Sequence, residues 1–267
     1  MHTIHRAFAW VLFAFCGAIA GVAHAAGTFD AVTGNVEMTG PSGSMVAATQ
    51  GATIQPGTTI TTADGAQAVI KFDDGSAVVL DMNTRFKVVD YQYDAAKPVA
   101  GRSVFDFLKG AARFVTGLIA RTEHANFSLR TPVATMGVRG TDFDVASGSL
   151  YISVKNGAVT ATNSAGTVGF GAGQDGYIAN AGTLARALPA VQLPDGVGGA
   201  FARLDAVQLP AGTLPPQAAG EGGAGGAPEP TGEGGGMSDT TAAAIGLGVV
   251  GAAALGGMHS SPTATHH

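Results

Sequence analysis

The chain has 267 residues and a formal net charge of −5, with 14 lysines and arginines against 19 aspartates and glutamates. This acidic balance argues against a general nucleic-acid binder, because such proteins present a basic surface. Glycine accounts for 41 residues, about double its usual share. The length fits one domain with tails, or two small domains.

The first 25 residues have the pattern of a secretory leader. Arg6 precedes an apolar run over residues 7–19, and Ala23-His24-Ala25 matches the small-residue cleavage pattern. The run is short for a membrane span, which needs about 20 residues. We therefore predict cleavage after Ala25 and a periplasmic or secreted protein, with an uncleaved membrane anchor as the alternative. Cys16, the only cysteine, lies in this leader, so stability must come from apolar burial rather than disulfides.

Short β-type segments with turn residues between them follow from residue 34 to about residue 177. Asp73-Asp74-Gly75-Ser76 separates the runs 68–72 and 77–80, which predicts a hairpin with a type I′ turn. Asn156-Gly157 separates 151–154 from 159–162 and predicts a second hairpin. Pro56-Gly57 marks a turn before 58–62, and 168–170 and 177–178 are further short strands. Such a series predicts an all-β sandwich, barrel or β-solenoid of short antiparallel strands.

Residues 103–120 interrupt this pattern. A helical stripe can be drawn through Val104, Leu108, Ala111 and Val115. Gly110 and Gly117 oppose it, because each glycine costs about 1 kcal/mol inside a helix. We predict a strand, a glycine turn and a second strand here, with a helix as the alternative.

The composition changes after residue 180. The sequence of residues 190–194, AVQLP, recurs at 206–210 in an extension over 181–211, and residues 201–204 are a candidate helical turn. Residues 212–239 have the Gly, Pro, Ala and Glu composition of a flexible, disordered linker. Residues 240–258 are uncharged and rich in Gly and Ala, marginal as a membrane span, and are followed by a polar tail over 259–267. We expect a weakly ordered or self-associating segment, with a membrane anchor as the alternative.

The sequence offers no recognisable catalytic, cofactor or metal site. Beyond the leader, histidines occur only at positions 124, 259, 266 and 267, with no metal-ligand spacing, and no G-x-S-x-G elbow is present. The glycines of 169–173 are not followed by a Gly-Lys-Ser/Thr element, so they are interpreted as turn residues rather than a phosphate loop. We therefore expect no enzyme and no cofactor.

Two charged groups are candidate binding features. Asp142 and Asp144 flank Phe143 and share one strand face, which is either a cation site or, more commonly, a polar outer face. Six basic residues fall close together in the sequence and would form an anion-binding patch if they shared a surface, the alternative being a scatter over several faces. They are Arg102, Lys109, Arg113, Arg121, Arg130 and Arg139.

The segment TPVATMGVRGTDF, residues 131–143, resembles the signature of the FecR domain family. The likeness continues in Gly34-Asn-Val36, the Asp74-Gly75-Ser76 hairpin, residues 109–113 and 156–159, and the closing residues 172–174. It implies a FecR-type β domain over about 30–180, in which the motif residues are fold determinants. These are Asp74, Gly75, Ser76, Thr131, Pro132, Gly140, Thr141 and Phe143.

In that family, a periplasmic domain senses the state of an outer-membrane receptor and signals through a membrane span to a cytoplasmic anti-sigma region. This chain has a leader where that region would be expected, which puts direct sigma-factor regulation in doubt. The resemblance implies an exported, non-catalytic interaction and signalling module whose partner is an envelope protein or an anionic envelope polymer. One alternative is a structural envelope protein, attached or self-assembled through 240–258 with weak membrane contact. An enzyme acting on polysaccharide through Asp142 and Asp144 is a third hypothesis.

Overall fold

The computed structural model describes residues 25–189 and 192–213. Two helices, α1 (Leu118–Thr122) and α2 (Asp195–Asp205), and two 3₁₀ turns, η1 (Pro98–Ala100) and η2 (His124–Asn126), accompany the strands. The strands are β1 (Gly27–Thr33), β2 (Val36–Thr39), β3 (Met45–Ala47), β4 (Thr53–Ile54), β5 (Thr59–Thr62), β6 (Gln67–Phe72), β7 (Ala77–Leu80), β8 (Arg85–Gln92), β9 (Arg102–Lys109), β10 (Ala111–Val115), β11 (Phe127–Arg130), β12 (Thr135–Ala146), β13 (Leu150–Asn163), β14 (Gly166–Gly171), β15 (Asp175–Ile178) and β16 (Arg186–Leu188).

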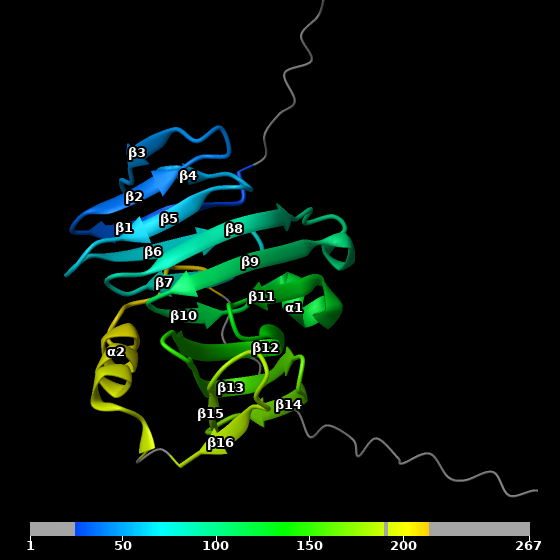
Figure 1. Cartoon of the computed structure of the whole chain (residues 1–267). Coiled ribbons are helices and arrows are strands. Elements are labelled where there is room, and N and C mark those ends of the chain that lie inside the picture. The colour runs from blue at the N-terminus through cyan, green and yellow to red at the C-terminus, as the bar shows by residue number, and fades with distance from the viewer. Residues whose placement is uncertain (1–24, 190–191, 214–267) are drawn as a thin grey trace, which may run out of the picture. The chain divides into compact units, whose positions relative to one another are not determined.

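All strands of the described ranges belong to one curled sheet (Figure 1). Its order is β3-β2-β5-β8-β9-β11-β12-β10-β7-β6-β1-β4, and β13 leaves this path to pair with β12, β14 and β15. Neighbouring strands are antiparallel except β9 and β11, which run parallel. The prediction of a mainly-β fold of short antiparallel strands is confirmed.

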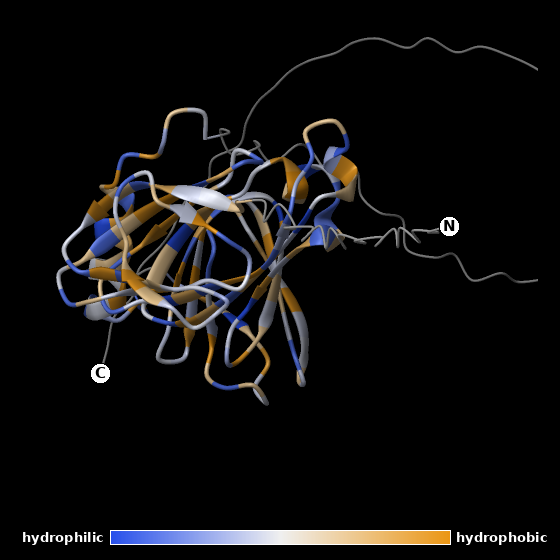
Figure 2. Ribbon diagram, turned by 90° about the horizontal axis from the view of Figure 1, so that it is seen from above, coloured by the Kyte–Doolittle hydropathy of each residue, from blue (hydrophilic) through white to orange (hydrophobic). Residues whose placement is uncertain are grey.

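A chain of aromatic rings fills the space between facing strands. Phe72 on β6 contacts Tyr91 on β8 and Phe105 on β9, with ring centroids 5.2 and 5.3 Å apart. Phe86 on β8 joins this group to Phe114 on β10, which stacks on Phe143 at 5.3 Å. Hydrophobic and hydrophilic residues alternate along many strands, as Figure 2 shows by colour, because successive side chains point to opposite faces. Burial of at least one face of most strands thus stabilises a fold that has no disulfide.

β12 and β13 bend together at two glycines. Gly140 and Gly157 have φ values of +57° and +78°, and the pairing register shifts between Arg139 and Asp142. The predicted hairpin at Asn156-Gly157 is wrong, because β13 runs without interruption from Leu150 to Asn163. The positive φ that Asn-Gly favours serves a β-bulge instead of a turn. Beyond this bend, β12 pairs with β10, whereas before it β12 pairs with β11.

The other local predictions in the first 180 residues are mostly confirmed. β6 and β7 form the hairpin at Asp74-Gly75, but only Gly75 has positive φ, and its N–H donates to the Phe72 carbonyl at 3.1 Å. That geometry is a type I turn followed by a left-handed glycine rather than type I′. Residues 103–120 form β9, a turn at Gly110 with φ of +97°, and β10, before the short helix α1.

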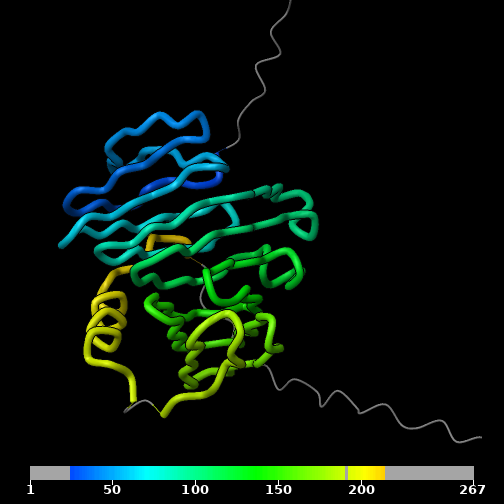
Figure 3. The backbone as a smooth tube through the Cα atoms, in the orientation of Figure 1, coloured from blue at the N-terminus to red at the C-terminus, as the bar shows by residue number. Residues whose placement is uncertain are grey.

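The C-terminal extension packs on the outer face of the sheet. β16 pairs with β15, and the predicted helical turn at 201–204 is part of the longer helix α2, which lies beside β10 and β12 (Figure 3). Phe201 and Leu204 of α2 form a second apolar cluster with Val69 and Val79. Leu193 and Leu209, one from each AVQLP repeat, pack against this cluster. The two repeats therefore flank one docked helix.

The predicted leader and the predicted C-terminal segments fall mostly outside the described ranges. Residues 1–24 include almost all of the predicted leader, and residues 214–267 include most of the linker, the Gly/Ala-rich segment 240–258 and the tail. Among residues 25–189 and 192–213, no helix has the length and apolarity to cross a membrane.

Gly157→Ala should destabilise the protein by about 3 kcal/mol, because the new Cβ has both an unfavourable φ and a backbone collision. An ideal Cβ at Gly157 would lie 2.6 Å from the Gly140 carbonyl oxygen. Gly43→Ala is the matched control, since Gly43 has φ of +84° but open space around its Cβ position. Urea unfolding should show a loss of only about 1 kcal/mol for the control. Equal losses for both variants would contradict a close-packed bend.

Candidate functional site

The signature residues Thr131 and Pro132 form the tight turn between β11 and β12. The Thr131 hydroxyl oxygen accepts hydrogen bonds from the backbone N–H groups of Val133 and Ala134, at 3.3 and 3.0 Å. The Thr131 N–H donates to the Ala134 carbonyl at 2.9 Å. Pro132, which has no N–H to pair, occupies the second position of this turn. The turn therefore holds Pro132 and Val133 at a fixed place on the surface.

A groove of about 340 Å³ lies beside this turn. Its remaining walls come from the end of β9 and from the turn between β12 and β13. The lining includes Leu108, Lys109, Pro132, Val133, Ser149 and Leu150. Leu108 is 41% exposed and lines the groove, so a large apolar side chain is accessible to a binding partner here. The lining residues offer apolar contact, hydroxyl groups and one cation, so this groove can bind an apolar side chain that carries an acidic neighbour.

The walls of the groove are tied together by hydrogen bonds. The Gly110 N–H donates to the Ser147 hydroxyl at 2.7 Å, and the Ser147 N–H donates to the Gly110 carbonyl at 2.8 Å. These bonds connect the turn after β12 to the turn after β9. The groove is thereby preorganised, which lowers the entropy cost of binding.

The signature residues Asp74, Gly75 and Ser76 connect a hairpin to a helix. Asp74 is buried, and its Oδ1 accepts hydrogen bonds from the Ser76 backbone and hydroxyl groups at 3.1 and 2.5 Å. The Tyr91 hydroxyl donates to the same oxygen at 3.2 Å. The other carboxylate oxygen accepts from the Ile119 N–H at 3.3 Å, at the first turn of α1. Asp74 therefore acts as a cap for a helix 45 residues later in the chain.

Burial and the Asp74 charge keep Tyr91 in its neutral form. Burial raises the pKa of Tyr91 well above its usual value, and the neighbouring Asp74 carboxylate raises it further. Tyr91 therefore stays a hydrogen-bond donor to Asp74 at every physiological pH. A Cβ at Gly117 would lie 2.4 Å from the Asp74 carbonyl oxygen, so glycine is needed where the helix approaches the hairpin.

The signature residues Gly140, Thr141 and Phe143 stabilise the bend in β12. The buried Thr141 hydroxyl donates to the Ala158 carbonyl at 2.9 Å and accepts from the Arg139 N–H at 3.1 Å. Thr141 satisfies backbone groups that the bulge leaves out of the ladder. Phe143 and Val145 are fully buried in the core. Structural roles thus account for these signature residues.

Asp142 and Asp144 share one face of β12, but this face is not the solvent-exposed surface expected from the sequence. Their exposures are 3% and 0%, because α2 covers them. Arg113 on β10 makes two hydrogen bonds to Asp142, at 2.9 and 2.7 Å. Lys155 on β13 lies 2.5 Å from Asp144. Each carboxylate is therefore already matched by a cation, which weakens both the metal and the catalytic interpretation.

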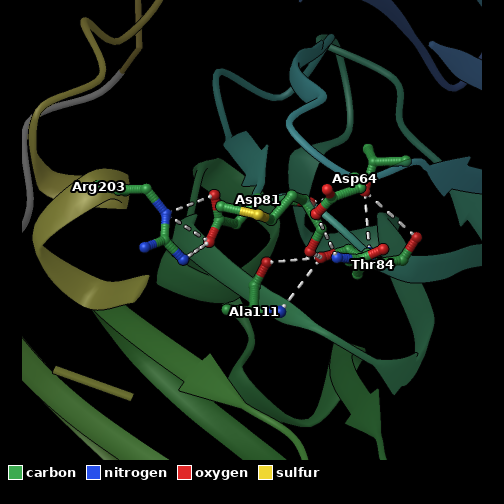
Figure 4. A network of polar contacts seen from close by, with 8 residues as sticks. Asp64, Asp81, Thr84, Ala111 and Arg203 are labelled. Carbon is green, nitrogen blue, oxygen red and sulfur yellow. Dashed lines mark hydrogen bonds and ion pairs between the residues drawn. The ribbon is translucent and has the colours of Figure 1, made fainter. Parts of the chain in front are cut away.

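Asp205 and Arg203 of α2 extend this ionic network to the helix. Asp205 contacts Lys155 and lies 3.8 Å from Arg113. Arg203 reaches across to Asp81, which follows β7, with contacts of 2.7 to 3.3 Å (Figure 4). The Asp81 carboxylate raises the pKa of Arg203. The helix is held to the sheet by charge pairs around an apolar contact.

The Asp144 carboxyl group is the least satisfied member of this network. Its Oδ1 is buried and has no hydrogen-bond partner in the described part of the chain. Burial raises the pKa of Asp144 to about 7, although Lys155 opposes this rise. Asp144 therefore gains a proton near neutral pH rather than near pH 4.

The six basic residues do not form one continuous patch in the structure. Arg113 is largely covered and bonded to Asp142, whereas Arg102 and Arg130 pair with Asp90 and Asp106 at 3.2 and 2.7 Å. Lys109 lines the groove, and Arg121 belongs to α1, where burial lowers its pKa. Arg139 is exposed and lies in a different hollow. The scattered arrangement, which the sequence left open, describes these residues best.

The groove itself was not predicted from the sequence. Its walls come from segments around residues 107, 131 and 148, which only the sheet topology brings together. The exposed Leu108, within a strand of alternating burial, is the one local signal that could have indicated it. His124 is exposed. In residues 25–189 and 192–213, no three His, Cys, Asp or Glu side chains gather as metal ligands.

Comparison with known proteins identifies the central part of this fold. Residues 58–160 match the model of the family described as FecR protein. Two crystal structures of a protein from Parabacteroides distasonis, named provisionally as an anti-sigma factor, are similar at 19% and 18% identity, with TM-scores of 0.39 and 0.40. The matches cover 49% of this chain and 58% of those chains. No curated protein matches the chain.

Asp74→Ala should cost about 3 kcal/mol of stability, because it leaves the Ile119 N–H and the Tyr91 hydroxyl without their buried acceptor. Asp73→Ala, at the exposed neighbouring position, should cost about 1 kcal/mol or less, because water replaces the contacts of an exposed carboxylate. Chemical denaturation followed by far-ultraviolet circular dichroism measures the free energy of unfolding of both variants. Equal effects would remove the helix-capping role of Asp74.

The contribution of Asp144 to stability should decrease as the pH rises. Its folded-state pKa of about 7 lies above the ordinary carboxyl value, so the folded protein binds the proton more tightly than the unfolded chain. The stabilisation is complete below about pH 4 and is lost as the pH rises through about 7. Asp144→Asn cannot ionise, so its stability should fall less between pH 5 and pH 8 than that of the parent. Parallel pH profiles from thermal unfolding would disprove this.

Proposed function

We propose that this chain is a non-catalytic recognition and signalling module of the bacterial cell envelope, because residues 58–160 match the family described as FecR protein. The groove beside the Thr131–Pro132 turn is the observation that supports recognition. Its rim carries the exposed Leu108, and its lining combines apolar side chains with Lys109. A protein segment with an apolar side chain and a nearby carboxylate fits this chemistry.

The leader supports an envelope location. The apolar run over residues 7–19 and the Ala23-His24-Ala25 pattern predict processing after Ala25. Ala26 is fully buried, and its N–H donates to the Ile54 carbonyl at 2.7 Å, directly before β1. A chain cut at this point would retain the complete sheet. The proposed mature protein therefore begins where the sheet begins.

Signalling by this module would proceed through contacts rather than chemistry. The buried carboxylates Asp142 and Asp144 are paired with Arg113 and Lys155 under α2, so they are not presented to a substrate. The walls of the groove are joined by the Gly110–Ser147 hydrogen bonds. An occupant is thus recognised by a rigid surface, and its binding changes which surfaces remain available to a second protein.

A photo-crosslinking side chain at position 108, introduced in living cells, tests the recognition surface. Position 108 should capture an envelope protein, whereas position 99, where Val99 is 65% exposed outside the groove, should not. Leu108→Asp should abolish capture by a crosslinker placed at Val133, because a charge replaces the apolar rim. Equal capture at 108 and 99, or capture of cytosolic proteins alone, would refute the proposal.

The location is tested separately by fractionation and mass measurement of the chain. A periplasmic or secreted form whose mass starts at Ala26 is expected. A cytosolic chain with an intact amino terminus would contradict the proposed location. The crosslinking experiment would still test the recognition surface separately.

A further inference from the structure

The outer face formed by β12, β13 and β14 carries small side chains and one arginine over three neighbouring strands. The register places Thr135 beside Thr162 and Thr167, and Gly137 beside Thr160 and Gly169. The third row contains Arg139, Ala158 and Gly171. Most of these residues are exposed, whereas the alternate residues of the same strands are buried in the core. We call these nine residues the threonine–glycine face.

Two of the three glycines of this face, Gly169 and Gly171, are not required by the fold, whereas a Cβ at Gly137 would lie 3.0 Å from the Thr160 hydroxyl oxygen. Gly169 does not have positive φ, and a Cβ placed on it would meet nothing within 4 Å. A Cβ at Gly171 would be in ordinary contact with Gln174, at 3.7 Å. Glycine inside a strand weakens it, and without a local reason it indicates a place where another chain or a ligand approaches closely. Gly169 and Gly171 therefore weaken β14 without a local packing reason, which points to a close approach of a ligand at this face.

A hollow of about 360 Å³ lies over the Arg139 end of the face. The residues that line it include Gly137, Arg139, Ala158 and Thr160 of the face and His124 of η2. This volume is within the range of small-ligand sites. In the described part of the chain, Arg139 makes no ion pair, in contrast to Arg102 and Arg130. The hollow thus combines a lining that includes the Thr160 hydroxyl group with the Arg139 guanidinium, which can form an ion pair with an anionic ligand.

The size of the face favours a narrow ligand over a protein. Three strands about 4.8 Å apart and five residues at about 3.4 Å each give a footprint of roughly 200 Å². A stable protein interface needs about 800 Å² from each partner. The face also carries no large exposed apolar side chain that would anchor such an interface.

We propose that the threonine–glycine face and the Arg139 hollow bind a carboxylated polysaccharide chain. The glycines let the sugar rings lie close to the sheet. The Thr160 hydroxyl donates to the Gly137 carbonyl at 3.3 Å, and the Thr162 and Thr167 hydroxyls bond each other at 2.9 Å. The oxygens of these hydroxyl groups still accept hydrogen bonds from sugar hydroxyls. Arg139 forms a charge-assisted pair with a sugar carboxylate. This binding uses surfaces other than the groove at Leu108 and does not depend on the proposed partner there.

Calorimetric titration of the full-length chain with three probes tests the ligand class. A hexamer of galacturonic acid should bind, whereas maltohexaose and hexaglutamate should each bind at least about tenfold more weakly. Equal binding of the neutral sugar would overturn the role of the carboxylate. Equal binding of the acidic peptide would overturn the polysaccharide. Failure of the galacturonate hexamer to bind would overturn the proposal as a whole.

Variants locate the site. Arg139→Gln should weaken binding of the galacturonate hexamer about tenfold, and Arg102→Gln, an exposed arginine off this face, should leave it unchanged. Gly169→Val should abolish binding while the melting temperature stays the same or rises, because valine favours a strand and its Cβ has open space. Unchanged binding by Gly169→Val, or equal effects of the two arginine variants, would contradict the assignment.

Two further measurements cover the case in which Gly169→Val unfolds and the case in which a second copy of this chain occupies the face. Should Gly169→Val unfold, Thr160→Val removes the central hydroxyl with little change of shape and should still weaken binding; unchanged binding would then overturn the site. Analytical sedimentation should give the same oligomeric state for the parent and for Gly169→Val. A dimer that the valine dissociates would identify a second copy of this chain as the occupant, and would overturn the polysaccharide.

Discussion

The paired bend in β12 and β13 determines how the rest of the sheet is arranged. Gly140 and Gly157 face each other with positive φ, and the space between them leaves no room for a Cβ. Thr141 bonds the backbone groups that this bend removes from the ladder. Because β12 changes neighbours at the bend, one half of it joins the aromatic core through Phe143 and the other half presents the threonine–glycine face. Two glycines thus separate an interior function from a surface function within one strand.

Long-range polar contacts hold the peripheral elements in place. Asp74 links the hairpin of β6 and β7 to α1, and Asp81, Asp142 and Asp144 hold α2 and its neighbours through paired cations. In each case a carboxylate is buried with hydrogen-bond partners that arrive from a distant segment. Removing one partner of such a pair is costly, because a buried charge is left without compensation. The apolar core stabilises the sheet, and these carboxylates hold α1 and α2 against it.

Local patterns predicted the strands well, since alternation and Asp74-Gly75 depend only on neighbouring residues. Asn156-Gly157 misled the prediction because the same positive φ serves a turn or a bulge, and only the pairing with Gly140 decides between them. The burial of Asp142 and Asp144 depends on α2, more than 50 residues later, whose glycines gave almost no helical signal. The groove at Leu108 and the face around Thr160 arise from strand register, which no single segment encodes.

The composition of α2 has a consequence for the order in which the protein opens. Three of its eleven residues are glycines, Gly196, Gly198 and Gly199, and no side chain caps its first turn. Such a short segment is helical only while Phe201 and Leu204 are docked on the sheet. Its amide protons should therefore exchange with deuterated solvent before those of β10 and β12, as a separate opening unit above the still-folded sheet. Docking and helicity in this segment are a single event.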